Sequence, residues 1–193
     1  MTKAKAVFLD RDGVLNEERG YLWLWSDWRW LPGVILALTR LKKAAYKLVV
    51  VTNQSGVAKG LYQESDVIAL HRRVAEDLAQ NGLVLDGYYY CPHHPDFPAS
   101  PGDDPCACRK PAPGLILAAA KDLDLDLSRS YLVGDKLSDL EAARAAGVKP
   151  ILVRGGYGSL AESQVAPDIP VVDDLPAAVD LILAKQITPL NLA

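Results

Sequence analysis

The chain reads Phe8-Leu9-Asp10-Arg11-Asp12-Gly13-Val14 near its start, and this segment indicates the architecture of all 193 residues. Ala6–Leu9 is a continuous apolar run, which predicts a short strand covered on both faces, as in a parallel sheet. Two aspartates follow at once, and Gly13 permits a tight turn. Ligands of such sheets bind where the strands end. The segment therefore predicts both a first strand and the beginning of a site.

Apolar runs and helical patterns alternate along the rest of the chain. The expected strands are Ala6–Leu9, Lys47–Val51, Gly87–Tyr90, Tyr131–Val133, Ile151–Val153 and Val171–Val172. The expected helices are Val34–Ala45, Glu64–Gln80, Pro113–Leu123, Asp139–Ala146 and Leu175–Ala184. This alternation predicts an α/β, Rossmann-like fold of three layers, in which helices cover both faces of a mainly parallel sheet. We expect one domain over residues 1–187, followed by a loose C-terminal tail, 188–193.

Composition limits the classes of partner. Half of the residues are hydrophobic and the net charge is -3, so the chain is globular and has no basic excess for nucleic acid or an anionic membrane. No apolar run approaches the roughly 18 residues of a membrane span, and the start lacks the pattern of a signal peptide. We expect a cytoplasmic monomer that binds neither nucleic acid nor membrane.

Polar residues follow four of the expected strands. The residues at these positions are Asp10, Thr52, Cys91 and Asp135. Because the carboxyl ends of parallel strands meet at one edge of a sheet, segments far apart in the sequence should converge there.

The carboxylates of this set suit phosphoryl transfer. Asp10 can attack phosphorus and carry a phosphoryl group, while Asp12 can protonate the leaving alcohol and then activate water. Two carboxylates beside a phosphate repel one another, so a divalent cation is needed, and Asp135 is a further ligand for it. A site of oxygen ligands with phosphate present favours Mg²⁺.

Donors for the phosphate are also present. Thr52 and Asn53 offer hydroxyl, amide and backbone donors, and Lys110 offers a fixed positive charge. Asp-x-Asp-Gly alone is weak evidence, since Asp and Gly are ordinary turn formers. The argument rests on the complete set occurring in the required order.

That set resembles the four motifs of the haloacid dehalogenase (HAD) superfamily. The matching segments are Phe8-Leu9-Asp10-Arg11-Asp12-Gly13-Val14, Val51-Thr52-Asn53, Arg109-Lys110-Pro111 and Gly134-Asp135-Lys136-Leu137-Ser138-Asp139. The resemblance implies a HAD-type fold with Asp10 as nucleophile, Asp12 as general acid and base, and Thr52 and Lys110 holding the phosphoryl group. It implies Mg²⁺ held by Asp10, the backbone carbonyl of Asp12, and Asp135.

Two further points follow from the same resemblance. Asp139 either supports the metal directly or makes a hydrogen bond behind its ligands. The gaps from Asp12 to Thr52 and from Asn53 to Arg109 leave no room for a cap domain, so the site should be open.

Cysteine and histidine gather between the third strand and Lys110. Cys91-x-His93 and Cys106-x-Cys108 bracket a proline-rich loop, 91–108, and thiolate and imidazole in this number suit tetrahedral Zn²⁺. His94 competes with His93; the family pattern favours His93. Four protein ligands leave no open position, so this zinc would be structural and would stiffen the segment that carries Arg109 and Lys110. The alternative is three reduced, buried cysteines beside a chance histidine.

The wider pattern closely resembles one phosphatase family, the D-glycero-D-manno-heptose-1,7-bisphosphate 7-phosphatases. It comprises Gly20-Tyr21, Thr52-Asn53-Gln54-Ser55-Gly56 and the Cys-Pro-His-His-Pro and Cys-Arg-Lys-Pro segments. The resemblance implies removal of the 7-phosphate of a phosphorylated sugar during activated heptose synthesis. The residues it implies for substrate binding are Glu18, Arg19, Gly20, Tyr21, Thr52, Asn53, Gln54, Ser55, Arg109 and Lys136.

Other functions share parts of this pattern. Histidinol-phosphate phosphatases have the same motifs and zinc loop. A phospho-accepting receiver domain also combines Asp, Thr and Lys, although it would usually lack an acid at the position of Asp12. A catalytically inactive binding module is disfavoured because every chemical residue is present.

All four tryptophans lie between residues 23 and 30. We expect this segment to pack on the domain surface, with a substrate rim or self-contact as the alternative.

Overall fold

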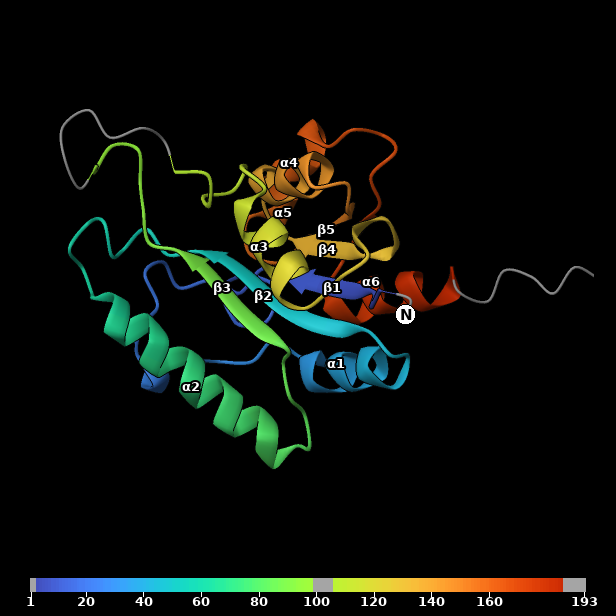
Figure 1. Ribbon diagram of the computed structural model, residues 1–193, viewed down its shortest axis with the longest axis horizontal. Coiled ribbons are helices and arrows are strands. Elements are labelled where there is room, and N and C mark those ends of the chain that lie inside the picture. Colours follow the sequence, from blue (N-terminus) through green and yellow to red (C-terminus); the bar gives the residue numbers. More distant parts are fainter. Residues whose placement is uncertain (1–2, 99–105, 186–193) are drawn as a thin grey trace, which may run out of the picture.

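The computed structural model describes residues 3–98 and 106–185 and contains one all-parallel sheet in the order β3-β2-β1-β4-β5-β6 (Figure 1). Its strands are β1 (Ala6–Leu9), β2 (Lys47–Asn53), β3 (Gly87–Cys91), β4 (Tyr131–Gly134), β5 (Lys149–Val153) and β6 (Val171–Val172). The chain steps outward from β1 to β3 and then returns to β4 on the other side of β1. This reversal creates a switch point between β1 and β4, where a ligand site is expected.

Helices cover both faces of the sheet, which confirms the expected three-layer α/β fold (Figure 1). They are α1 (Val34–Lys43), α2 (Glu64–Gln80), α3 (Gly114–Asp122), α4 (Leu137–Ala145), α5 (Gly158–Ala161) and α6 (Leu175–Ala184). Helices α1, α2 and α6 pack on one face and α3 and α4 on the other, so the sheet lies between two apolar cores.

Strand β1 shows why this sequence forms a buried parallel strand. Val7 and Leu9 point into one core, whereas Ala6 and Phe8 point into the other, and all four are fully buried. Neighbouring strands lie on both edges, with Phe8 opposite Val49 of β2 and Leu132 of β4. Burial of apolar area of this kind is the main favourable term in folding.

Some boundaries differ from expectation. Strand β2 continues to Asn53 because β3 pairs with it as far as Cys91, so Thr52 lies inside the strand and not after it. Helix α1 ends at Lys43, two residues early, and α4 begins at Leu137. The short helix α5 was not anticipated, since four residues are too few to show a period.

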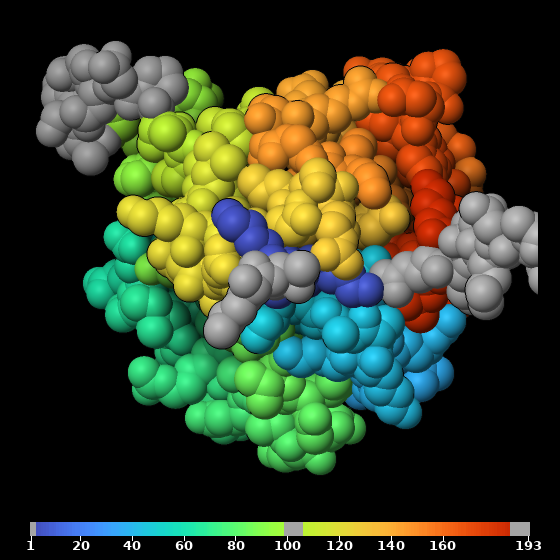
Figure 2. Space-filling view, turned by 45° about the vertical axis from the view of Figure 1, so that its right-hand side comes forward, coloured from blue at the N-terminus to red at the C-terminus, as the bar shows by residue number. Residues whose placement is uncertain are grey.

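The amino ends of the strands form the edge opposite the expected site. Here the first described residues lie on the surface between the segments after α1 and after α3 (Figure 2). The backbone N–H of Ala4 donates to Asp124 (3.1 Å), and that of Lys47 donates to Lys5 (2.9 Å). This edge holds Ala4 and Lys5 in place and leaves the carboxyl edge free for chemistry.

The tryptophan segment packs mainly against the domain, as expected. Trp28 is buried, with Trp25 stacked on it and Trp30 edge-on at 5.0 Å between ring centroids. Trp30 Nε1 also donates to Asp77 of α2 at 2.8 Å. Trp23 differs: it is partly exposed and tilts against Tyr62. The segment thus joins the first site loop to α2.

Within the described residues the sheet and its helices leave no separate cap domain, in agreement with the short gaps between motifs. No helix there is long and apolar enough to cross a membrane.

Candidate active site

Three carboxylates converge where β1 and β4 end. Asp10 follows β1, Asp135 follows β4, and Asp139 lies in the first turn of α4. Each offers an oxygen within 4.8 Å of the others, and all three side chains are buried. Buried like charges at this spacing are costly unless cations compensate them.

Lys110 supplies one such cation from the segment before α3. Its buried Nζ lies 2.9 Å from Asp10 and 2.6 Å from Asp139, and it donates to the backbone carbonyl of Val51 at 2.8 Å. Burial by itself raises the pKa of Asp10, but the charges of Lys110 and Lys136 and a hydrogen bond from Lys110 outweigh it and lower that pKa. Asp10 is therefore kept ionised, as a nucleophile must be.

The negative charge of the Asp135 carboxylate is only weakly compensated by neighbouring donors and cations. One carboxylate oxygen accepts from the backbone N–H of Tyr157 (2.9 Å); the other is buried without a hydrogen-bond partner among the described residues, and Lys136 Nζ is 3.8 Å from it. Burial first, and then the charge of Asp10, raise the pKa of Asp135 to about 8. An orphaned carboxylate oxygen beside two other carboxylates fits a hard divalent cation.

Glycines make room for this carboxylate. A side-chain carbon at Gly13 would lie 2.4 Å from Asp135 Oδ2, and one at Gly156 would lie 2.1 Å from the same atom. Both glycines also have positive φ angles, +87° and +52°. The loop after β5 therefore closes around Asp135, a contribution that sequence reasoning missed.

Asp12 lies apart from the carboxylate triplet and has its own donors. Its side chain accepts from Arg11 Nε (3.1 Å), Asn16 Nδ2 (2.9 Å) and Gln54 Nε2 (3.2 Å). Its side chain is not part of the group whose oxygens meet within 4.8 Å. This separation fits a side chain that handles protons while others hold a metal. The metal contact expected of Asp12 would be made by its backbone carbonyl and would not require the side chain.

Two residues expected to contact substrate, Asn53 and Gln54, have side chains engaged inside the protein. Asn53 exchanges both side-chain hydrogen bonds with the backbone of Lys110, each 3.0 Å long. Gln54 is buried; its amide donates to Asp12 and Thr52, and its carbonyl accepts from Tyr62 (2.9 Å). Both side chains are thus hydrogen-bonded within the protein, Asn53 at the end of β2 and Gln54 directly after it, and their contact with substrate stays a prediction.

The other expected contacts surround the carboxylates. Glu18 accepts from Lys136 Nζ at 3.1 Å and from the backbone of Gly20 at 2.8 Å. Burial lowers the pKa of Lys136, but the charges of Asp10, Asp135 and Glu18 raise it by more, so the net shift is upward. Lys136 thus stays charged beside the site.

The remaining candidates lie farther out on the loops. Arg19 pairs with Glu17 at the surface (2.7 Å). Tyr21 is exposed, and its hydroxyl accepts from Lys59 (2.7 Å). Ser55 follows the end of β2 and is half-buried.

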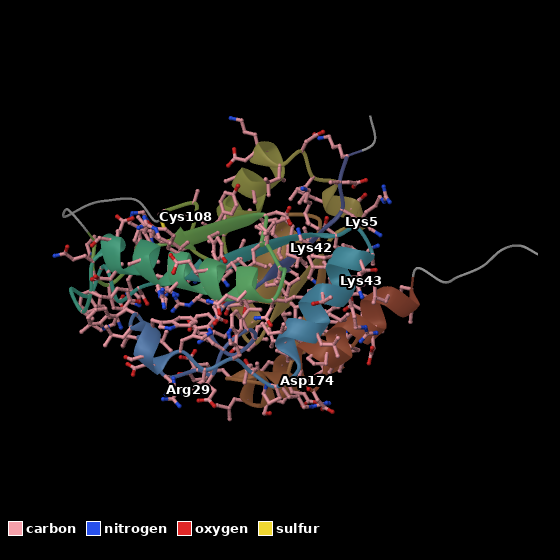
Figure 3. All side chains as sticks on the ribbon, turned by 90° about the horizontal axis from the view of Figure 1, so that it is seen from below. Lys5, Arg29, Lys42, Lys43, Cys108 and Asp174 are labelled. Carbon is pink, nitrogen blue, oxygen red and sulfur yellow. The ribbon has the colours of Figure 1, made fainter. Side chains whose placement is uncertain are left out.

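The cysteine and histidine side chains meet as expected. Cys91, His93, Cys106 and Cys108 each offer an atom within 4.8 Å of the others. His94 lies outside this group, where its Nδ1 accepts from the backbone of Asp96 (3.2 Å). Figure 3 shows Cys108 at the end of the molecule away from Lys5 and Lys42. The cluster is compatible with a zinc site; residues 99–105 of the loop lie outside the described part.

This cluster is joined to the catalytic segment. Arg109 donates to the backbone carbonyl of His93 at 2.9 Å, and Gly114 N–H donates to Ala107 at 3.0 Å. The segment that carries Lys110 is thus held by the cysteine loop on one side and by Asn53 on the other.

Sequence reasoning overlooked the groups around Asp12, namely Arg11, Asn16 and Tyr62. Arg11 stands inside the motif, yet its residue type alone does not indicate burial, since most arginines are exposed. Asn16 and Tyr62 carry no sequence motif, and their role becomes visible only when the fold brings them close to Asp12 and Gln54.

Comparison with known proteins identifies the family to which this chain belongs. Residues 107–178 match the family model described as HAD-hydrolase-like. The D-glycero-beta-D-manno-heptose-1,7-bisphosphate 7-phosphatase of Yersinia pestis is 42% identical over 90% of this chain and 94% of its own length. The Escherichia coli K12 protein of the same name is 44% identical over 90% and 93%.

A solved structure agrees as well. The D,D-heptose 1,7-bisphosphate phosphatase of B. bronchiseptica, complexed with magnesium and phosphate, is 40% identical and superposes with a TM-score of 0.83, covering 94% of this chain and 99% of that one.

Proposed function

This chain belongs to the D-glycero-beta-D-manno-heptose-1,7-bisphosphate 7-phosphatase family of HAD-like hydrolases, and we propose that it removes the 7-phosphate of that sugar through an aspartyl-phosphate. Its relatives are phosphatases, so it is a phosphoric monoester hydrolase. The observation that carries the proposal is the convergence of Asp10, Asp135 and Asp139 on Lys110, with Asp12 held separately. A receiver domain needs no such separate acid.

In the first step, an oxygen of Asp10 forms a bond to phosphorus and the bond from phosphorus to the sugar oxygen breaks. Asp12 gives its proton to that oxygen, so the sugar leaves as an alcohol. In the second step, Asp12 takes a proton from water, and the resulting hydroxide bonds to phosphorus. The bond to Asp10 then breaks, inorganic phosphate leaves, and both aspartates return to their first state.

Mg²⁺ would be held by Asp10, Asp135 and the backbone carbonyl of Asp12, with Asp139 supporting it. When bound, it neutralises charge on the phosphoryl oxygens. Lys110 supplies a second positive charge beside Asp10, and Thr52 can donate its hydroxyl hydrogen to a phosphoryl oxygen. Asn53 fixes the backbone of Lys110 and thereby the position from which the lysine side chain extends to Asp10.

The second phosphate or the hydroxyls of the sugar would meet Lys136 and Arg109, with Glu18 as an acceptor. These charges stand on three separate segments around the carboxylates, and Arg109 offers the planar fork that suits phosphate. No cap covers them in the described residues, so short loops would determine which phosphate ester is accepted.

The test compares two substrates. We expect a kcat/KM for the heptose bisphosphate at least about tenfold above that for histidinol phosphate, because only the sugar offers a second phosphate to Lys136 and Arg109, a difference of about 1.4 kcal/mol. Phosphate release with each substrate should be measured with Mg²⁺ and again after removal of divalent cations. A preference for histidinol phosphate would reject the substrate but leave the chemistry intact. Full activity without divalent cations would reject the metal role.

Zn²⁺ would occupy the cluster of Cys91, His93, Cys106 and Cys108 and hold the loop that carries Arg109 and Lys110. Four ligands from protein close the coordination sphere, so this ion would have a structural task.

Replacing a zinc ligand should therefore loosen this segment. We expect Cys106→Ser to lose zinc and to lower kcat by about tenfold, similar to the loss when a support of a metal site is removed. Zinc content and turnover of 4-nitrophenyl phosphate would be measured together.

The adjacent histidines give a matched control for this experiment. His93→Asn should reproduce the loss of Cys106→Ser, whereas His94→Asn should retain zinc, because His94 lies outside the cluster. A Cys106→Ser protein that lacks zinc but turns over at the full rate would show that the loop and the active site are independent.

A further inference from the structure

Arg11 has the largest of the fully buried side chains among the described residues, with 1% of its surface exposed. An arginine in such a place is rare, because its charge loses water on burial and must be paired. Its ion-pair partner among the described residues is Asp12, the neighbouring residue in the chain. The proposed mechanism assigns Asp12 to proton transfer and leaves Arg11 without a task.

The contact between the two side chains is a fork. Arg11 Nε lies 3.2 and 3.1 Å from the two oxygens of Asp12, and Nη2 lies 3.2 and 2.9 Å from the same two oxygens. Nη2 also donates to the backbone carbonyl of Leu22 at 2.8 Å. A planar guanidinium that contacts both oxygens fixes the rotation of a carboxylate, which a single point charge cannot do.

Further donors hold Asp12 from its other sides. Asn16 reaches one oxygen and Gln54 the other, and Gln54 is itself held by Tyr62. Leu22 belongs to the apolar core that also contains the buried residues of α2, and Trp23 tilts against Tyr62, so Arg11 joins Asp12 to a packed part of the fold. Donors within the protein thus surround Asp12, and its remaining exposed edge is small.

We propose that Arg11 is a positioning residue for the acid–base step: its fork orients the Asp12 carboxylate for proton exchange with the leaving alcohol and with water. The inference rests on the proposed role of Asp12. A side chain that merely fills the interior would have no need of a charge, since replacing both partners of a buried ion pair with apolar side chains is often neutral for stability.

Substrates with different leaving groups can distinguish a positioning role of Arg11 from a role in supporting the fold. Phenol and sugar oxygens need a proton to leave, whereas 4-nitrophenolate leaves without one. In Arg11→Met we expect kcat/KM to fall about 100-fold with the heptose bisphosphate and with phenyl phosphate but only about threefold with 4-nitrophenyl phosphate, since general acid catalysis is worth about 10²–10⁴. Because kcat/KM reports the steps through alcohol release, the second step does not mask this difference. In contrast, kcat should fall with every substrate, since hydrolysis of the aspartyl-phosphate also uses Asp12.

Two more variants keep the test decisive. Arg11→Lys retains the charge without the fork, so it should show the same substrate dependence to a smaller degree. Arg144→Met removes an exposed arginine that pairs with Asp168 and should leave all substrates unchanged. If Arg11→Met does not fold, Arg11→Lys takes over the comparison.

Equal losses of kcat/KM with all three substrates would overturn the proposal, and so would unchanged kcat/KM with phenyl phosphate. Failure of both Arg11 variants to fold would assign the residue to the fold and would also overturn it. If the wild-type enzyme ignores the heptose bisphosphate, the proposed substrate fails, while the two aryl phosphates still test Arg11.

Discussion

Asp10→Asn is expected to abolish turnover, with a fall in kcat of roughly five to six orders of magnitude, the scale of losing a covalent nucleophile. The amide is a poor nucleophile toward phosphorus, and the mutation keeps the size of the side chain. Phosphate release from the heptose bisphosphate and from 4-nitrophenyl phosphate would measure the loss. No leaving group should rescue the variant, because the attacking atom itself is missing.

Two controls make this result specific. Asp180→Asn changes an exposed aspartate that pairs with Arg40 and should keep full activity. Asp10→Ala excludes slow deamidation of the new asparagine as a source of residual turnover. Activity of Asp10→Ala within about 100-fold of wild type would refute the nucleophile assignment, since the remaining groups alone supply far less than the full rate.

Lys110→Met is expected to harm both stability and activity. Lys110 is buried between Asp10 and Asp139, and its removal leaves two buried carboxylates without their cation. Breaking a buried ion pair by removing one partner costs about 3–5 kcal/mol in the free energy of unfolding. We expect a loss of this size in urea denaturation at neutral pH, together with a fall in kcat of roughly 100-fold or more from lost charge on the phosphoryl group.

A second substitution separates these two effects. Lys110→Met combined with Asp139→Asn removes one of the uncompensated charges, so the double variant should regain part of the stability that Lys110→Met loses. Its activity should stay low, because no cation has been returned to Asp10. If the double variant is no more stable than Lys110→Met, the ion pair with Asp139 is not what this lysine contributes to the fold.

Much of the fold and of the site chemistry could be read from local sequence. Ala6–Leu9 is apolar on both faces because both faces of a parallel strand are buried, and such a run needs no knowledge of its neighbours. The motif order placed Asp10 and Asp135 at one edge, because all parallel strands end on the same side. The gathering of Cys91, Cys106 and their neighbours in one polar loop indicated a metal cluster, because it is also visible in the local sequence.

The roles of individual polar side chains were decided only by the tertiary structure. Asn53 and Gln54 were predicted to bind substrate, and only the structure shows that the side chain of Asn53 also bonds the backbone of Lys110 and that of Gln54 bonds Asp12. His93 and His94 offer the same chemistry; the family pattern favoured His93, and the structure shows that His93 is the one that meets the cysteines.

The sequence by itself determined which chemical groups are present and at which end of the sheet they gather, since those follow from residue type and strand direction. The tertiary structure decided the partner of each group, such as the fork of Arg11 on Asp12 and the loop of Gly156 around Asp135. The physical reason is that a hydrogen bond depends on the donor–acceptor distance to within fractions of an ångström, and also on the angle at the hydrogen. Those quantities are set by contacts between distant segments, which periodicity along the chain does not contain.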